Sequence, residues 1–116
     1  MRPANKVGSK NNREQTATAI HTATGAETSF TTVAAVLPGG AVGMPRKLYA
    51  SGSVGGLVQI QYGSQAVKTI AVAPNQLPVE YDIPLESFPN KVGSVNIQFE
   101  AFGAGTLVGI VSFSVG

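Results

Sequence analysis

The chain has 116 residues, no cysteine, 12% charged side chains and a formal net charge of +2 at pH 7. This length suits one domain with a single core, and the missing cysteines exclude disulfides, thiolate zinc sites and cysteine nucleophiles. No apolar run reaches the roughly 20 residues that span a bilayer, and the N-terminus lacks the apolar core of a signal peptide, so we expect no membrane partner and synthesis in the cytoplasm. The charged share is about half the usual one, which favours a protein that assembles with a partner.

Residues 1–15 are the most basic stretch of the chain. They carry four basic side chains and one acidic one, whereas residues 16–116 carry four basic and five acidic side chains. The stretch has too few apolar groups to offset the entropy of ordering it, so we predict a flexible basic N-terminal arm at 1–15 and a folded domain at 16–116. The candidate contacts to a partner protein in the arm are Arg2, Lys6, Lys10 and Arg13. They are too sparse, and too poor in interleaved aromatic rings, for nucleic acid to be an expected partner.

The remainder of the chain divides into short β segments separated by turn residues. We expect strands at 16–24, 28–37, 47–51, 58–62, 66–73, 79–85, 94–102 and 106–115. In the fourth of these, apolar side chains alternate with Gln59 and Gln61, which leaves one polar face for solvent or a hydrogen-bonding partner.

The stretch from Pro38 to Pro45 reads as a long loop, because its prolines cannot donate to a sheet and its glycines can adopt positive φ. A crossover between two sheets is the favoured interpretation of this loop. A binding loop or a subunit contact is the other, with Met44 and the neighbouring Arg46 as candidate contacts.

The last two segments have the clearest alternation. Val95, Ile97 and Phe99 alternate with polar residues, and the segment after Gly103-Ala104-Gly105 repeats the pattern. We predict that the two segments pair as an antiparallel hairpin, with Phe99 in the core, and that upstream strands supply a second sheet for the hairpin to pack against.

About eight strands at regular spacing, with no convincing amphipathic helix, indicate an all-β fold. We predict a single small antiparallel β-sandwich, jelly-roll-like in arrangement. An immunoglobulin-like sandwich is disfavoured because the chain has no tryptophan for its core.

The sequence contains few candidate catalytic or metal-binding residues. The only histidine, His21, has no carboxylate close by in sequence, and a lone strand histidine is more often satisfied or exposed than catalytic. Glu80 and Asp82 project from one strand face, where they suit a solvated face better than calcium or acid and base roles. Serines and glycines match no nucleophile elbow, phosphate loop or dinucleotide fingerprint. We therefore expect no enzyme, no metal and no cofactor.

Exposed aromatic rings would indicate a glycan-binding module, since sugars stack on them. Most aromatic residues fall on expected inward positions; those that do not are Tyr49, Phe88 and Phe102. Phe88 and Phe102 lie at strand or loop ends, which makes them candidate contacts to a sugar or to a neighbouring subunit. Packing of the two rings over the edge of the sandwich is the favoured alternative.

A charge-poor, cysteine-free, Gly/Thr/Ser-rich small β-sandwich behind a short basic arm (Met1-Arg2-Pro3-Ala4-Asn5-Lys6 onward) resembles the cement or decoration proteins of tailed-phage capsids. The resemblance covers the whole chain but is one of composition and architecture. It implies a structural protein, often a homotrimer, that binds the major capsid protein on the outer virion surface and stabilises contacts between coat subunits. The main alternative is a glycan- or receptor-binding β-sandwich module of a viral or bacterial surface structure. A third is a small coat subunit whose arm faces nucleic acid, against which the weak charge of the arm counts.

Overall fold

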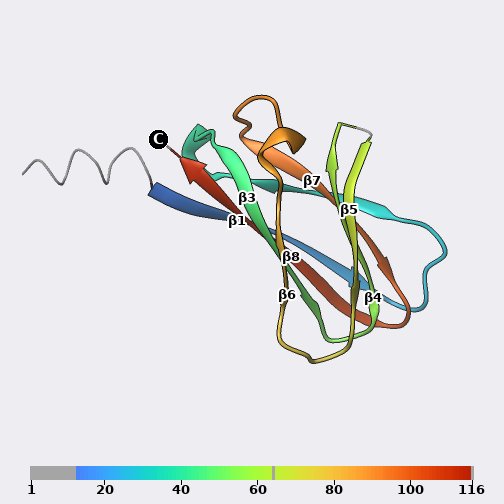
Figure 1. Ribbon diagram of the computed structural model, residues 1–116. Helices are drawn as coiled ribbons and strands as arrows, with labels where there is room; N and C mark the ends of the chain where they lie inside the picture. The colour runs from blue at the N-terminus through green and yellow to red at the C-terminus, as the bar shows by residue number, and fades with distance from the viewer. Residues whose placement is uncertain (1–12, 64, 116) are drawn as a thin grey trace, which may run out of the picture.

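A computed structural model describes residues 13–63 and 65–115 of the chain (Figure 1). Two short 3-10 turns lie at Pro38–Gly40 and Leu85–Ser87. The described chain is otherwise built from strands and loops, and no helix in it is long and apolar enough to cross a membrane. Its strands are β1 (Arg13–Ala23), β2 (Thr31–Val36), β3 (Met44–Gly52), β4 (Gly56–Tyr62), β5 (Gln65–Val72), β6 (Val79–Asp82), β7 (Ser94–Ala101) and β8 (Gly105–Val115).

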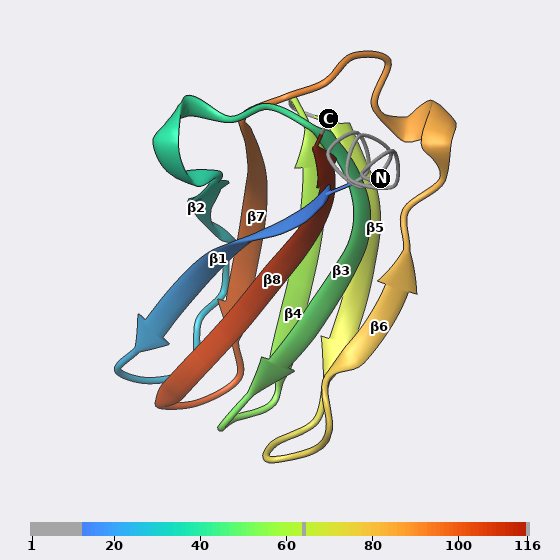
Figure 2. The same ribbon diagram turned by 90° about the vertical axis from the view of Figure 1, so that its left-hand side faces the viewer.

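The strands form two antiparallel sheets that lie face to face (Figure 2). The first sheet has the order β1-β8-β3-β6 and the second has the order β2-β7-β4-β5. Two four-stranded sheets connected in this order make a jelly roll. The predicted all-β, jelly-roll-like sandwich is therefore confirmed.

The core lies between the two sheets and follows from period-two alternation along the strands. In β7 every second side chain is buried, and Phe99 is 0% exposed. Phe113 of β8 and Leu48 of β3 are likewise fully buried from the other sheet. Because packed sheets stand about 10 Å apart, two layers of such side chains fill the space between them.

The predicted pairing of the last two strands is wrong. β7 pairs with β2 and β4 in the second sheet, whereas β8 pairs with β1 and β3 in the first. Their apolar faces oppose each other across the core, and at Gly109 of β8 an added Cβ would lie 3.1 Å from Cγ2 of Ile97 on β7. Alternation shows which side of each strand is apolar, but not whether two apolar sides lie side by side or face to face.

Two expected boundaries also differ. β1 begins at Arg13, so the last three residues assigned to the arm pair instead with the end of β8. The loop expected to reach Pro45 ends earlier, because Met44 and Pro45 already belong to β3. The loop does cross from the second sheet to the first, and Gly39 and Gly40 adopt positive φ of 66° and 72° within it.

Candidate functional site

The outer face of the first sheet carries two rows of side chains that run across its strands. The first row joins Thr16, Ser112, Lys47 and Asp82, which are successive partners in the sheet register. The second row joins Thr18, Ile110, Tyr49 and Glu80 in the same way. Each row draws on β1, β8, β3 and β6, so four distant segments of the chain build one surface.

A β-bulge places two cationic side chains together at one end of this face. The register of β3 against β8 shifts between Pro45 and Lys47, so Arg46 is an extra residue without a partner on β8. A bulge of this kind re-aims side chains and is common next to functional sites. The carbonyl oxygen of Arg46 accepts a 2.9 Å hydrogen bond from the N–H of Ile83, which ties the bulge to the segment after β6.

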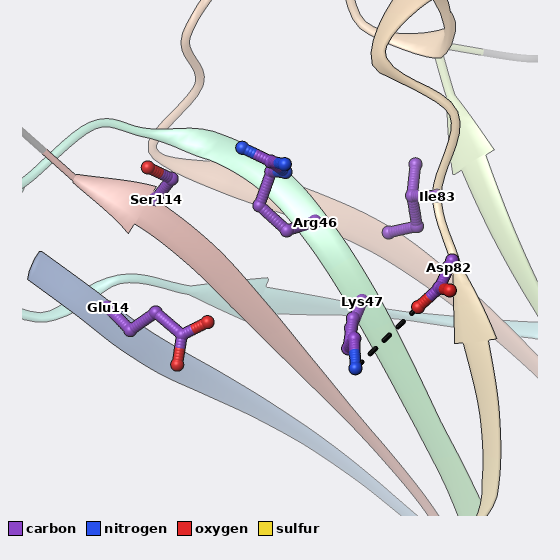
Figure 3. A pocket seen from close by; sticks show the side chains of 6 residues that line it. All are labelled: Glu14, Arg46, Lys47, Asp82, Ile83 and Ser114. Carbon is purple, nitrogen blue, oxygen red and sulfur yellow. Dashed lines mark ion pairs between the residues drawn. The ribbon is translucent and has the colours of Figure 1, made fainter. Parts of the chain in front are cut away.

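The bulge borders a cleft of about 460 Å³ on this face, within the size range of ligand pockets (Figure 3). The cleft is lined by Glu14, Arg46, Lys47, Asp82, Ile83 and Ser114. Figure 3 shows Glu14 on β1 and Lys47 on β3, with β8 between them. Two carboxylates, two cations and a hydroxyl therefore surround one hollow.

Lys47 is the electrostatic centre of the face. Its Nζ lies 3.6 Å from Oε1 of Glu80 and 3.7 Å from Oδ1 of Asp82. Glu80 first, and then Asp82, raise the pKa of Lys47 above its ordinary 10.5, because both carboxylates favour the charged ammonium. Lys47 therefore stays a charged hydrogen-bond donor between two charged acceptors at neutral pH.

Tyr49 lies one row away from the cleft and supplies an aromatic surface. It is partly exposed, and its register partners are Ile110 on β8 and Glu80 on β6. Residues two apart on a strand face are about 7 Å apart, so the ring of Tyr49 and the ammonium of Lys47 lie within reach of one small ligand. A flat apolar ring beside fixed donors and acceptors is the combination that binds a polyhydroxylated molecule.

The outer face of the second sheet is polar without an aromatic ring. Gln98 Nε2 donates to Oγ1 of Thr32 at 3.0 Å, and Gln59 Nε2 donates to Oγ1 of Thr69 at 2.8 Å. These four residues form one row in the register. The polar face expected around Gln59 and Gln61 is thus present, but it offers amides and hydroxyls with no ring for stacking.

The side chains predicted as partner contacts do not gather in one place. Arg2, Lys6 and Lys10 lie outside the described residues. Arg13 opens β1 and Arg46 lines the cleft. Met44 is half-buried against the core rather than in a free loop.

The two aromatic residues predicted as contacts differ in exposure. Phe102 is 56% exposed at the turn between β7 and β8. Phe88 is only 2% exposed and packs edge-on against Tyr62 with ring centroids 5.3 Å apart, so it follows the favoured alternative of packing at the sandwich edge and is not an exposed contact residue. An aromatic residue before a proline reads as a loop end in sequence, but this ring turns back to cover the sandwich edge.

His21 has the carboxylate partner that the sequence did not indicate. Its Nε2 lies 2.8 Å from Oε2 of Glu27, and its ring stacks on Phe99 with centroids 5.8 Å apart. Glu27 also accepts a hydrogen bond from the N–H of Ala101 at 2.9 Å. The Ala101 N–H first, and His21 second, lower the pKa of Glu27 below 4.5. The pair therefore connects the loop after β1 to the end of β7, and its role is structural.

Tyr49 and the pair of Glu80 and Asp82 were noted in the sequence, but Lys47, which forms ion pairs with both carboxylates, was missed. No local sequence pattern indicates a role for Lys47, because its partners lie on a strand more than thirty residues away in the chain. Both carboxylates form ion pairs with the lysine. The described residues contain no group of three His, Cys, Asp or Glu that could hold a metal ion.

Comparison with known proteins finds similarity in solved structures alone. The sequence matches no protein-family model and no curated protein. A structure of a variant of a family 29 carbohydrate-binding module covers 91% of this chain and 77% of its own, with 16% identity and a TM-score of 0.49. Another structure, described as a family 29 carbohydrate-binding module, covers 90% of each chain with 14% identity and a TM-score of 0.43. At this identity the likeness concerns the fold alone.

The prediction of a capsid decoration protein is wrong on this comparison. The similar solved structures named above are described as carbohydrate-binding modules, whereas the resemblance to decoration proteins rested on composition and architecture. The physical reason is that a small, charge-poor β-sandwich has the same composition whatever its outer faces bind. No structural observation tests the expected coat-protein partner, the trimer or the virion location, so these stay predictions.

Proposed function

We propose that this chain is a glycan-binding β-sandwich module that binds a neutral, hydroxyl-rich sugar on the outer face of the first sheet. The observation that carries the proposal is the adjacency of Tyr49 to the ion-paired group of Lys47, Glu80 and Asp82, beside a cleft of about 460 Å³. The ring offers a stacking surface, and the charged groups offer a donor between two acceptors for vicinal hydroxyls. Ser114 adds a hydroxyl on the far side of the cleft.

The mixture of charges favours an uncharged ligand. The cleft is lined by two cations, Arg46 and Lys47, and by two carboxylates, Glu14 and Asp82. The electrostatic potential in the cleft therefore has no single sign that would select an anionic or a cationic sugar. The similar solved structures are also described as carbohydrate-binding modules, which agrees with the proposal without carrying it.

We take the site to bind rather than to catalyse. Glu80 and Asp82 are both paired with Lys47 and are well exposed, with side-chain exposures of 53% and 82%. A catalytic carboxylate pair normally lies where water is excluded and where the two pKa values are driven apart.

The test is a glycan microarray followed by titration calorimetry on the best ligand. We expect Tyr49→Ala to weaken binding at least tenfold, because a stacked ring contributes about 0.5–1.5 kcal/mol beyond the area it buries, and the two contributions together exceed the roughly 1.4 kcal/mol that a tenfold change requires. Tyr49→Phe should retain most of the affinity because it keeps the ring. Asp82→Ala should weaken binding by removing an acceptor, and Gln59→Ala on the second sheet should leave it unchanged.

Circular dichroism of each variant shows whether the fold is kept. The proposal fails if no glycan binds at millimolar concentration, or if Gln59→Ala weakens binding while Tyr49→Ala and Asp82→Ala do not.

A further inference from the structure

β1 is an outside strand with a long, regular and open edge. It pairs only with β8 in the first sheet, through eleven consecutive residue pairs from Arg13 to Ala23 without a register shift. Among the described residues, none of the backbone hydrogen bonds made outside the sheet ladders involves a β1 residue. An edge of this kind presents unpaired N–H and C=O groups to another strand.

The other three edge strands carry the features that block such pairing. β6 has four residues, lies between Pro78 and Pro84, and carries two exposed carboxylates. β5 has a register irregularity against β4 and an exposed Lys68. β2 has no charge, but it is six residues long and ends just before Pro38. Proline, charge, bulges and shortness are the usual means by which proteins protect sheet edges.

β1 has none of these features along most of its length. From Gln15 to Ala23 it contains no proline, lysine, arginine, aspartate or glutamate. It also exposes Ile20 to 57%, an apolar side chain at an edge where charge would be expected. The contrast with the other edges singles out β1 as the edge built to be paired.

β1 is also complementary to itself. In an antiparallel pair of two β1 strands centred on Thr18, Arg13 would lie opposite Ala23, and Glu14 would lie opposite Thr22. No like charges meet in this register, and the two Thr18 side chains form a cross-strand threonine pair, which is a favourable one.

We propose that two copies of this chain pair through β1, edge to edge and antiparallel, and join their first sheets into one continuous eight-stranded sheet. The contact is isologous about a two-fold axis, so it closes with two copies and does not continue to a third. The proposal does not depend on glycan binding, because it rests on backbone edges and strand composition. It favours a dimer over the trimer that the sequence resemblance implied.

The test is the mass of the full chain in solution, measured by sedimentation equilibrium over a concentration series. We expect a reversible species of twice the chain mass of 11.9 kDa. Thr18 is exposed, so Thr18→Lys and Thr18→Glu should fold, yet each places like charges opposite each other across the axis. Each variant alone should dissociate at least tenfold more readily, and an equimolar mixture of the two should recover the dimer.

The matched control is Ala34→Lys, an exposed position in the middle of β2, an edge strand without charged residues. It should leave the dimer unchanged. A monomer or a trimer of the unmodified chain overturns the proposal, as does a dimer that Thr18→Lys leaves intact. A dimer broken by Ala34→Lys and not by Thr18→Lys overturns it in favour of the β2 edge.

Discussion

Replacing Phe99 with alanine is the sharpest test of how the core is assembled. Phe99 is 0% exposed, stacks on His21, and its ring reaches to 3.6 Å from where a Cβ at Gly109 would stand. A buried aromatic side chain removes on the order of 150–250 Å² from water, worth about 4–6 kcal/mol at about 25 cal/mol per Å². Alanine retains part of this, and we expect Phe99→Ala to lower the free energy of unfolding by about 3–5 kcal/mol.

The assay is urea and thermal unfolding of the two proteins at neutral pH. In a domain of this size the expected loss lowers the melting temperature by about 10–20 °C. Phe102→Ala is the matched control, since the same residue type is 56% exposed only three positions along the chain, and it should cost less than about 1 kcal/mol. An unchanged denaturation midpoint for Phe99→Ala, or equal losses for the two variants, would refute the assignment of Phe99 to the core between the sheets.

Three further changes test local features of the fold. The Ala101 N–H and the histidine beside it lower the pKa of Glu27 below 4.5, so Glu27 stabilises the fold fully above its unfolded pKa and loses that effect as the pH falls through the lowered pKa. The urea midpoint of Glu27→Gln should therefore lie below that of the unmodified protein at pH 6, and the two midpoints should converge as the pH falls below 4.5. A gap that stays constant with pH would contradict this. Gly56→Ala places a Cβ 2.6 Å from a backbone carbonyl oxygen and should cost about 1–3 kcal/mol, whereas Gly25→Ala, with nothing within 4 Å, should stay within about 0.5 kcal/mol. Gln15→Leu should raise the unfolding free energy by about 1 kcal/mol, because Oε1 of Gln15 is buried without a hydrogen-bond partner among the described residues; a clear loss of stability would show that the amide is satisfied in solution.

Local chemistry was enough to predict the strands and their inward faces. The alternation around Ile97 and Phe99 predicted a half-buried strand, and both residues are fully buried. Turn residues bounded the strands to within three positions at each end. Side-chain period and turn composition are properties of a few neighbouring residues, so they can be read from one chain.

Strand pairing could not be predicted in the same way. β7 and β8 follow each other in the chain and have complementary patterns, yet they belong to different sheets. The link between them passes from one sheet to the other, and only the full set of eight strands decides that this arrangement buries more apolar surface than a hairpin would. Pairing is a property of the whole domain, not of the segment.

The candidate site was missed for a related reason. Tyr49 and the carboxylates of Glu80 and Asp82 were recognised separately, but Lys47 becomes important only when β3 and β6 pair. A predicted cluster would have required the register of that pair, which no turn between the two strands fixes, because β4 and β5 intervene in the chain.

The bulge at Arg46 connects the packing of the core to the placement of the site. Pro45 and Leu48 are both fully buried, although they are three positions apart and strict alternation would put them on opposite faces. One extra residue between them resolves the conflict, and Arg46 is that residue. Without the bulge, burial of Pro45 would turn Lys47 into the core and Leu48 out to solvent. The apolar residues on either side therefore force the cations onto the outer face, so the core itself positions the charged end of the candidate glycan site.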